Sequence, residues 1–348
     1  MAKAKKKLLP KDFEAMLEGG DLAALERVFD DRELDARGGY AKQTALAFYA
    51  CPDELARWLV AKGASLSATD TWRNTPLHTR AQRGHIEVLL ELGADVHAEA
   101  TIGTPLHAAA EGKRARNAAL LLEHGAEVDA RNSEGLTPLE LSLRGCSNIE
   151  LERMVALARV LLEAGAEKTP AASRFVAEIG KRFEFHRDAF AKDSVVAAGA
   201  ALEALYELFG VAKVARRVTH DGRSPIVVKA TRWQDQHAEL WDLLVPSSGP
   251  AATVQGEVIR IAGRIARELD DNGGANWDDS FRAMATAFGE HVATGVALPT
   301  PDLQAARAIV QDLVRRARGD TSRMAALAVA WVLANPTPIA LATPGYRR

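Results

Sequence analysis

The sequence predicts a mostly α-helical protein, in which a stack of repeated helix pairs precedes a helical C-terminal domain. A four-residue phrase, Thr-Pro-Leu-His or a variant of it, begins at Thr44, Thr75, Thr104 and Thr137, at spacings of 31, 29 and 33 residues. A Gly-Ala pair follows each copy, and the period ends after residue 166. Repetition at about 20–50 residues is typical of a solenoid, because single units bury their apolar faces only by stacking on each other.

Each phrase also predicts where a helix begins and ends. Threonine is a preferred N-cap residue and proline is favoured at the first helical position, so Thr75 and Pro76 should open a helix. The glycine of each Gly-Ala pair should end the second helix of its unit, because glycine readily takes the positive φ found at helix C-termini. These glycines are Gly63, Gly93, Gly125 and Gly165.

Thr-Pro-Leu-His at this spacing resembles the ankyrin repeat. The resemblance covers about four repeats in residues 11–168, with residues 11–37 as an N-terminal capping unit. It implies helix pairs with projecting turns. The distance from Thr104 to Gly125 fits the family pattern, whereas the shorter distance from Thr75 to Gly93 predicts a second helix about one turn short. The resemblance further implies that the histidines of the phrase make structural hydrogen bonds between neighbouring turns.

The resemblance also implies a binding surface, since partners of this family contact the turn tips and the first helix of each pair, on the concave side. Transferred to the matching positions, this pattern gives the candidate partner-binding residues Tyr40, Lys42, Thr71, Trp72, Arg73, Asn74, Arg83, Ile102, Glu111, Ser133, Glu134, Leu136 and Arg144. Tyr40, Trp72 and Ile102 are large apolar side chains at positions expected to face solvent, and aromatic residues are enriched at binding hot spots. The alternative for Trp72 is packing on a neighbouring turn. Arg73 stands where the family usually has glycine.

Charge is unevenly distributed along the chain. Residues 1–11 have five lysines and no acidic residue, residues 12–170 have 17 Lys and Arg against 26 Asp and Glu, and residues 171–348 have 22 against 20. The acidic repeats disfavour nucleic acid and would attract a basic partner by long-range electrostatics. Residues 1–10 are predicted to be a disordered basic tail, the usual state of a short charged terminus.

The composition favours a cytoplasmic protein. No run reaches the roughly 18 consecutive apolar residues of a membrane span, and the few apolar residues after the first lysines do not make a secretory signal. The two cysteines, Cys51 and Cys146, form no CxxC motif and fit a reducing compartment. The Ala- and Arg-rich usage favours a bacterial source.

Residues 169–348 are predicted to form an α-helical domain whose pattern indicates no particular family. Helices are expected from Thr169 to about Arg187, and at about 193–210, 231–245, 253–271, 278–293, 301–318 and 320–334. The only β element expected is one short hairpin, with strands at 214–219 and 226–228 around Asp221-Gly222. Gly256 and Gly263 interrupt a predicted helix, which indicates close packing against that face.

The second half contains no recognisable catalytic or metal-binding motif. It lacks Gly-x-Ser-x-Gly, HExxH, P-loop and GxGxxG sequences. His220 with Asp221, or His237 with Glu239, would act as an acid–base pair only if folding brought other groups to them, and a solvated or structural role fits them better. We therefore expect no catalytic residue, no metal and no cofactor.

The sequence thus favours a non-enzymatic protein that binds a protein partner on the concave ankyrin face. The acidic balance and the apolar turn tips favour a basic partner, which the repeats would neutralise in the manner of an immunity or antitoxin-like protein. The alternative is an enzyme with a catalytic helical domain in residues 169–348 and repeats that recruit substrate. A third hypothesis, nucleic-acid binding through the lysines of residues 1–11, is disfavoured by the acidic repeats. The sequence leaves the oligomeric state open.

Overall fold

The computed structural model describes residues 4–346, which contacts divide into two compact units. Unit 1 comprises the residues up to Phe183 together with Ala191–Val214, and unit 2 comprises Glu184–Phe190 together with the residues from Ala215 onward. Helices dominate both units, which confirms the predicted fold class. Among the described helices, none combines the length and the apolar composition needed to cross a membrane.

Unit 1 begins with a small sheet and two short helices. Its strands are β1 (Lys6–Leu8), β2 (Arg32–Gly38) and β3 (Gln43–Thr44), and β2 lies in the middle, parallel to β1 and antiparallel to β3. Helices α1 (Phe13–Gly19) and α2 (Leu22–Arg27) lie between β1 and β2 in the chain. This segment precedes the first repeat and packs on it through the Phe13 ring, whose centroid lies 5.6 Å from that of Phe48.

The N-terminal segment differs from the disordered basic tail predicted for residues 1–10. Residues 1–3 lie outside the described residues, but Lys6–Leu8 form β1. The Lys6 N–H donates to the Asp31 carbonyl oxygen at 2.8 Å, and the Lys6 ammonium pairs with the Asp31 carboxylate at 2.6 Å. Leu9 is buried. The strand forms because β2 supplies backbone hydrogen-bond partners for it. The composition of residues 1–10 alone cannot predict partners that lie more than 20 residues away in the chain.

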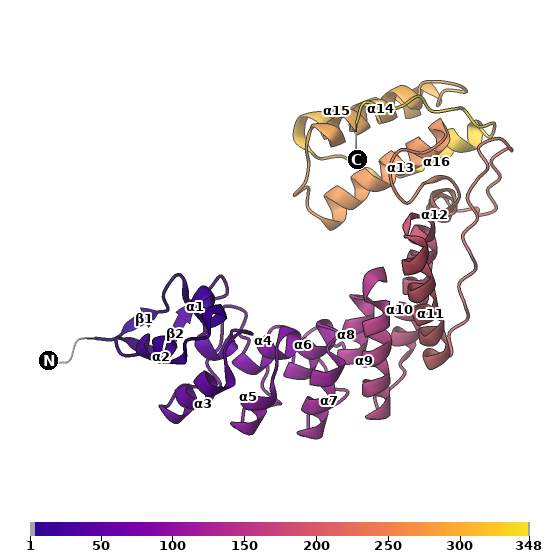
Figure 1. Ribbon diagram of the computed structural model, residues 1–348. Helices are drawn as coiled ribbons and strands as arrows, with labels where there is room; N and C mark the ends of the chain where they lie inside the picture. The colour runs from indigo at the N-terminus through magenta and orange to yellow at the C-terminus, as the bar shows by residue number, and fades with distance from the viewer. Residues whose placement is uncertain (1–3, 347–348) are drawn as a thin grey trace. The chain divides into compact units, whose positions relative to one another are not determined.

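The repeat helices form two rows (Figure 1). The first helices of the pairs are α4 (Pro76–Arg83), α6 (Pro105–Glu111) and α8 (Pro138–Arg144), and the second helices are α3 (Asp53–Ala61), α5 (Glu87–Glu91), α7 (Ala115–Glu123) and α9 (Leu151–Glu163). The degenerate first phrase makes only a 3-10 turn, η1 (Ala45–Ala47). The predicted Thr-Pro helix starts are confirmed, as is the short second helix, since α5 has 5 residues and α7 has 9.

Histidine hydrogen bonds join each repeat to the next. His78 Nδ1 accepts from the Thr75 N–H at 3.3 Å, and His78 Nε2 lies 3.0 Å from the Gly103 carbonyl oxygen. Because a carbonyl oxygen only accepts, Nε2 carries the proton and the imidazole is neutral. His107 makes the same contacts one repeat later, to the Thr104 N–H at 3.1 Å and to the Leu136 carbonyl oxygen at 3.0 Å. The predicted structural role of both histidines is confirmed.

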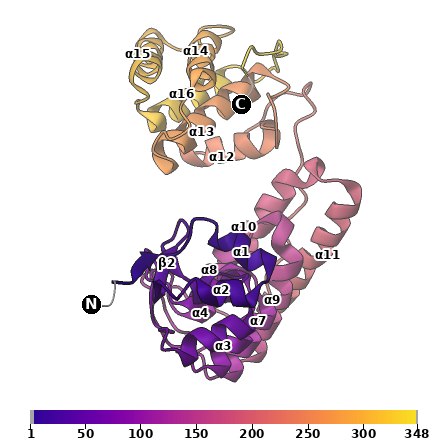
Figure 2. The ribbon, with the colours of Figure 1, turned by 60° about the vertical axis from the view of Figure 1, so that its left-hand side comes forward.

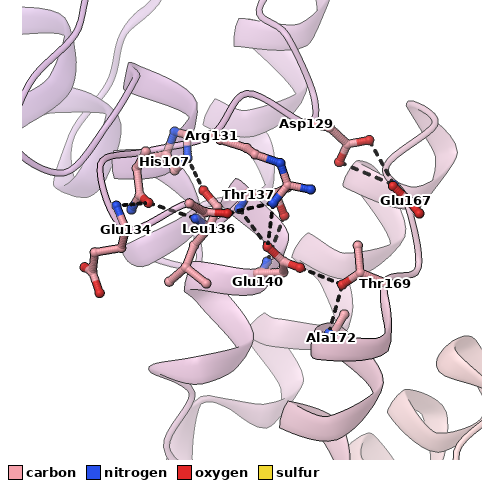
Figure 3. Close-up of polar contacts among 12 residues, drawn as sticks. His107, Asp129, Arg131, Glu134, Leu136, Thr137, Glu140, Glu167, Thr169 and Ala172 are labelled. Carbon is pink, nitrogen blue, oxygen red and sulfur yellow. Dashed lines mark hydrogen bonds and ion pairs between the residues drawn. The ribbon is translucent and has the colours of Figure 1, made fainter.

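Glu140 takes the place of the histidine in the last copy of the phrase (Figure 3). One carboxylate oxygen accepts from the Thr137 N–H at 3.0 Å and lies 3.8 Å from an Arg131 guanidinium nitrogen. The other accepts from the Thr169 hydroxyl at 2.6 Å. The Thr169 hydroxyl itself accepts from the Ala172 N–H at 3.1 Å. Exchanging a donor for an acceptor thus lets the last repeat bind the next helix start through a threonine hydroxyl.

The stack continues past the last phrase. Thr169 precedes α10 (Pro170–His186), and α11 (Lys192–Phe209) packs against α9. The Arg182 guanidinium donates to the Cys146 carbonyl oxygen at 2.7 Å. Unit 1 therefore includes residues 169–183 and Ala191–Val214, beyond the repeat domain of residues 11–168 predicted from the sequence. The difference arises because the sequence period ends there while helix packing and hydrogen bonding go on.

Two turn tips place a basic residue in left-handed backbone. Lys42 and Arg73 have φ values of 56° and 66°, and Gly135, at the same position two residues before the threonine of its phrase, has a φ of 75°. Arg73 therefore keeps the turn geometry that glycine gives elsewhere in the family. A residue with a Cβ costs roughly 1–2 kcal/mol in this conformation.

Unit 2 is a helical cluster around α13. Its helices are α12 (Trp233–Leu244), α13 (Val254–Ala266), α14 (Asp279–His291), α15 (Thr300–Arg316) and α16 (Thr321–Ala334), with a π-helical segment η4 (Arg267–Asp271) after α13. Figure 2 shows α13 running among α12, α14 and α16. The helices predicted for this half are confirmed, within a few residues at their ends.

The hairpin considered for residues 214–228 does not form. The described chain has no strand between residues 211 and 232. The His220 N–H donates to the Leu243 carbonyl oxygen at 2.9 Å, and the Ile226 N–H donates to the Pro336 carbonyl oxygen at 2.8 Å. The two segments thus take partners from elsewhere in unit 2 rather than from each other.

The two glycines of α13 permit close packing, as their presence in a helix predicted. A Cβ on Gly263 would lie 2.3 Å from the Trp241 ring, and a Cβ on Gly256 would lie 2.9 Å from the Leu244 carbonyl oxygen. Both contacts are closer than real Cβ atoms make. Glycine is therefore the residue that lets α12 approach α13.

Acid should destabilise unit 1 through His78 and His107, the two histidines that join neighbouring repeats. Burial lowers the pKa of His78 and of His107 below the ordinary 6.5. The unfolded chain therefore binds more protons than the folded chain as the pH falls. The free energy of unfolding should fall as pH drops from 7 to 5, by on the order of 1 kcal/mol per histidine. Urea unfolding at both pH values measures this. An equally large fall in a His78→Gln/His107→Gln variant would contradict it.

Replacing Arg73 by glycine should stabilise unit 1. The change relieves the left-handed strain but gives the unfolded chain more freedom, so we expect a net gain of on the order of 0.5–1 kcal/mol. Thr71→Gly, in the same turn but without positive φ, should instead destabilise by a similar amount. Urea unfolding of the full chain compares the two. A loss of stability in Arg73→Gly would show that its side chain contributes more than the strain costs.

Replacing Gly263 by alanine should destabilise unit 2 by roughly 1–2 kcal/mol. Overpacking against Trp241 costs more than the gain of about 1 kcal/mol in helix propensity. Gly289→Ala in α14 is the matched control, because a Cβ there would meet Val310 at an ordinary 3.4 Å. Urea unfolding should rank the control above the wild type and Gly263→Ala below it. The reverse order would mean that Trp241 moves aside freely.

Candidate functional site

The repeats of unit 1 enclose an open groove of about 720 Å³, here called the repeat groove. Its lining comes from α1, from the turn tips, and from the first helices α4, α6 and α8. The predicted binding residues that line it are Tyr40, Trp72, Asn74, Arg83, Ile102, Glu111, Glu134 and Arg144. Residues far apart in the sequence are therefore gathered along one surface of the stack.

The remaining predicted residues, Lys42, Thr71, Arg73, Ser133 and Leu136, do not line the groove. Lys42, Arg73 and Ser133 are exposed at the tips. The Thr71 N–H donates to the Ala41 carbonyl oxygen, and the Leu136 carbonyl oxygen faces His107, so the backbone of both serves the turns. Contact with a partner stays a prediction for all thirteen residues.

Short polar side chains fix the shape of the tips that border the groove. The Asp70 carboxylate accepts from the Trp72 and Asn74 N–H groups, both at 2.8 Å. Asn132 does the same two turns later, for the Glu134 and Leu136 N–H groups at 3.0 Å. These bonds are typical of Asx turns, which hold the backbone without a neighbouring strand.

Hydrogen bonds also tie one tip to the next. The Thr71 N–H donates to the Ala41 carbonyl oxygen at 3.0 Å, and the Thr101 hydroxyl donates to the Trp72 carbonyl oxygen at 2.8 Å. The tips are thus held in register along the stack. A ligand in the repeat groove would meet a preformed surface, which lowers the entropy lost on binding.

Exposed aromatic rings mark the N-terminal half of the groove. Tyr40 is 93% exposed and Trp72 is 47% exposed, and their ring centroids lie 5.9 Å apart with the planes tilted by 40°. The neighbour-turn contact considered for Trp72 is therefore present, yet much of the ring still faces solvent. Ile102 is only half-buried rather than fully exposed. Large aromatic surfaces without a covering are typical of interaction sites.

The charges of the groove are paired mainly in its C-terminal half. The Arg144 guanidinium donates to the Glu134 carboxylate at 2.6 and 3.2 Å, which lowers the pKa of that carboxyl. The Gln82 amide donates to the Glu111 carboxylate. In contrast, no described residue makes a hydrogen bond or ion pair with the side chain of Glu14 or of Arg83. These two charges are available to a ligand.

Sequence reasoning missed several lining residues, among them Glu14, Phe48, Tyr49 and Leu141. Tyr49 is 53% exposed, and its aromatic type was a signal that could have been read. Glu14 carried no signal, because it belongs to α1 of the capping unit and only the tertiary fold brings it to the groove. Phe48 and Leu141 are buried apolar residues that form part of the floor.

The acid–base pairs considered in unit 2 are used structurally. The Glu239 carboxylate accepts from the Lys229 and Ala230 N–H groups at 2.9–3.0 Å. His237 stacks on Trp241, and burial lowers the pKa of its imidazole. His220 Nδ1 accepts from the Gly222 N–H at 3.0 Å. These contacts stabilise the loops around α12.

The cysteines are equally unsuited to chemistry. Both are buried, and burial raises the pKa of Cys51 to about 12 and that of Cys146 to about 11. A thiol so far from ionisation is a poor nucleophile at neutral pH. Within residues 4–346, no cluster of three or more His, Cys, Asp or Glu side chains has the arrangement of a metal site.

Comparison with known proteins identifies the repeats. Two family models of ankyrin repeats match residues 45–98 and 89–142. The chain is 57% identical over 54 residues to ankyrin repeat and SOCS box protein 11 of Danio rerio, covering 16% of this chain and 18% of that protein. It is 38% identical over 100 residues to ankyrin repeat and SOCS box protein 5 of Mus musculus, covering 28% and 30%.

A bacterial protein gives a similar match. The chain is 41% identical over 93 residues to an ankyrin repeat protein of Rickettsia felis, covering 25% of this chain and 41% of that protein. The chain thus spans less than half the length of each of these relatives. The family matches, the recurring phrase and the paired helices agree over the same segment, and residues 45–142 of this chain are ankyrin repeats.

Proposed function

We propose that this chain is a non-enzymatic interaction protein that holds a protein partner in the repeat groove. Ankyrin repeats imply protein–protein interaction. The observation that carries the proposal is the exposed Tyr40–Trp72 ring pair inside a preformed groove of about 720 Å³. Aromatic residues in a concave surface are the usual anchors of protein interfaces.

The charge distribution supports a basic partner. Acidic residues outnumber basic ones by 26 to 17 in residues 12–170, and the groove lining itself has four acidic residues and two arginines. A field of this sign speeds the encounter with a basic protein. A protein that occupied the groove stoichiometrically would be kept from other contacts, which is how an immunity or antitoxin-like protein neutralises its target.

No observation on the described residues specifically supports the alternative of a catalytic domain in residues 169–348. The two acid–base pairs considered in unit 2 bind backbone groups or stack on Trp241, as described above. The second unit has an apolar helical core centred on α13. These features suit a structural or binding role for unit 2.

A Tyr40→Ala/Trp72→Ala variant should lose its partner. Truncating one hot-spot aromatic weakens binding by a factor of about 30 or more, because such an anchor contributes about 2 kcal/mol or more, so the double variant should lose at least that much. Capture from cell extract with the tagged full chain, followed by mass spectrometry, compares wild type and variant. Ile149→Ala, at an 84% exposed residue outside the groove, is the matched control and should capture as the wild type does.

A partner retained by the double variant would refute the proposed site. Circular dichroism of the variant checks that the repeats still fold. Repeating the capture at raised salt separates the charge argument from the site argument, since screening over a Debye length of about 8 Å at physiological ionic strength weakens surface attraction. If capture needs the two rings but does not change with salt, the proposed site in the groove stands and the proposal of a basic partner is refuted.

A further inference from the structure

We infer that the N-terminal half of the repeat groove binds an arginine side chain of the partner, which lies on the Tyr40 and Trp72 rings and pairs with the Glu14 carboxylate. The inference rests on the proposed function and specifies the chemistry that the groove recognises. It predicts an extended partner segment with one arginine at this position.

The rings offer faces to a cation. Tyr40 is almost fully exposed and about half of Trp72 is exposed, so each ring keeps part of its surface open to a ligand. A third ring, Tyr49, lines the same groove and is also exposed. A guanidinium over an aromatic face gains electrostatic attraction from the ring quadrupole, and tryptophan gives the strongest attraction.

An unpaired carboxylate lies at the same end of the groove. Glu14 follows Phe13, whose ring packs on Phe48 with centroids 5.6 Å apart. The Phe48 ring in turn lies 3.5 Å from where a Cβ on Gly39 would be, and Gly39 precedes Tyr40. These contacts bring the start of α1 and the Tyr40 turn together. Glu14 is exposed and makes no hydrogen bond or ion pair with any described residue, so its charge is available to a cation.

The rest of the groove disfavours a run of cations. Glu134 is already paired with Arg144, and Glu111 accepts from Gln82. Arg83 lines the groove without a described partner and would repel a second basic side chain. Lys42 and Arg73 are exposed at the bordering tips and add to this repulsion. A single arginine beside Glu14 therefore fits the charge pattern better than a polybasic segment.

The geometry favours arginine over lysine. A guanidinium is planar and weakly hydrated, so it stacks on an exposed ring while its N–H groups bond a carboxylate in the plane. An ammonium is a compact, strongly hydrated charge that gains less from such an open site. The open groove and the exposed rings thus suit a stacked guanidinium.

A short peptide tests the inference directly. The probe is an acetylated and amidated Gly-Ser nonapeptide with one central arginine, titrated into the 15N-labelled full chain. The chain has six tryptophans, so six indole N–H signals are expected, and the one missing in Trp72→Leu belongs to Trp72. The arginine peptide should shift that signal. Counterparts with citrulline, an uncharged isostere, or with lysine should bind at least about tenfold and threefold more weakly.

Variants locate the contacts. Glu14→Gln should weaken the arginine peptide about three- to tenfold, whereas Glu18→Gln, an exposed residue of α1 outside the groove, should not change its affinity. Trp72→Leu retains apolar bulk without a ring face and should lower the affinity about tenfold. The indole signals, six in Glu14→Gln and Glu18→Gln and five in Trp72→Leu, report whether the fold is intact.

Equal binding of the citrulline peptide, or no effect of Glu14→Gln, would overturn the inference. Lysine binding as tight as arginine would overturn the choice of a guanidinium. If the peptides fail in these ways while partner capture still requires Tyr40 and Trp72, the proposed function stands and this inference falls. If capture is also independent of the two rings, both fall.

Discussion

The hydrogen bond from one Thr-Pro-Leu phrase to the next turn is the interaction on which unit 1 depends. At His78 and His107 a single neutral imidazole accepts from its own helix start and donates to the carbonyl oxygen of the following turn. One side chain therefore both caps its own helix and bonds the repeat to its neighbour. Because a helix end leaves unsatisfied backbone groups, a residue that satisfies one and binds the neighbouring repeat makes local and tertiary structure agree.

The last repeat shows how the stack can be joined to helices that do not follow the repeat pattern. Glu140 retains the capping bond that the histidine makes in the other repeats. Its second carboxylate oxygen accepts a hydrogen bond from the Thr169 hydroxyl at 2.6 Å, at the start of the next helix. The buried carboxylate would be costly without such bonds. This exchange joins a strict repeat to the longer helices α10 and α11, which carry the packing further than the sequence period.

The repeat groove follows from the same register. Asp70 holds the Trp72 tip, and the Thr71 N–H of that tip donates to the Ala41 carbonyl oxygen of the preceding one, which places Tyr40 and Trp72 side by side. Strain at Lys42 and Arg73 is retained at these tips, where glycine would be easier. Among the charged side chains that line the groove, those of Glu14 and Arg83 have neither a hydrogen bond nor an ion pair with any described residue. Rigid tips and exposed rings, together with the unbonded Glu14 and Arg83 side chains, are the features on which the proposed recognition of a single arginine rests.

The sequence alone determined the repeats, because Thr, Pro and Gly act through local capping and backbone preferences that need no distant partner. It also determined most helices of unit 2 from their apolar spacing, and the close approach to Gly263 from a glycine in a helix. Only the tertiary structure decided the rest. Lys6–Leu8 form a strand because β2 supplies their hydrogen-bond partners, and residues 214–228 form no hairpin because their backbone groups bond other segments of unit 2. Glu14 joined the repeat groove through the packing of Phe13 on Phe48, a contact 35 residues apart that no local pattern encodes.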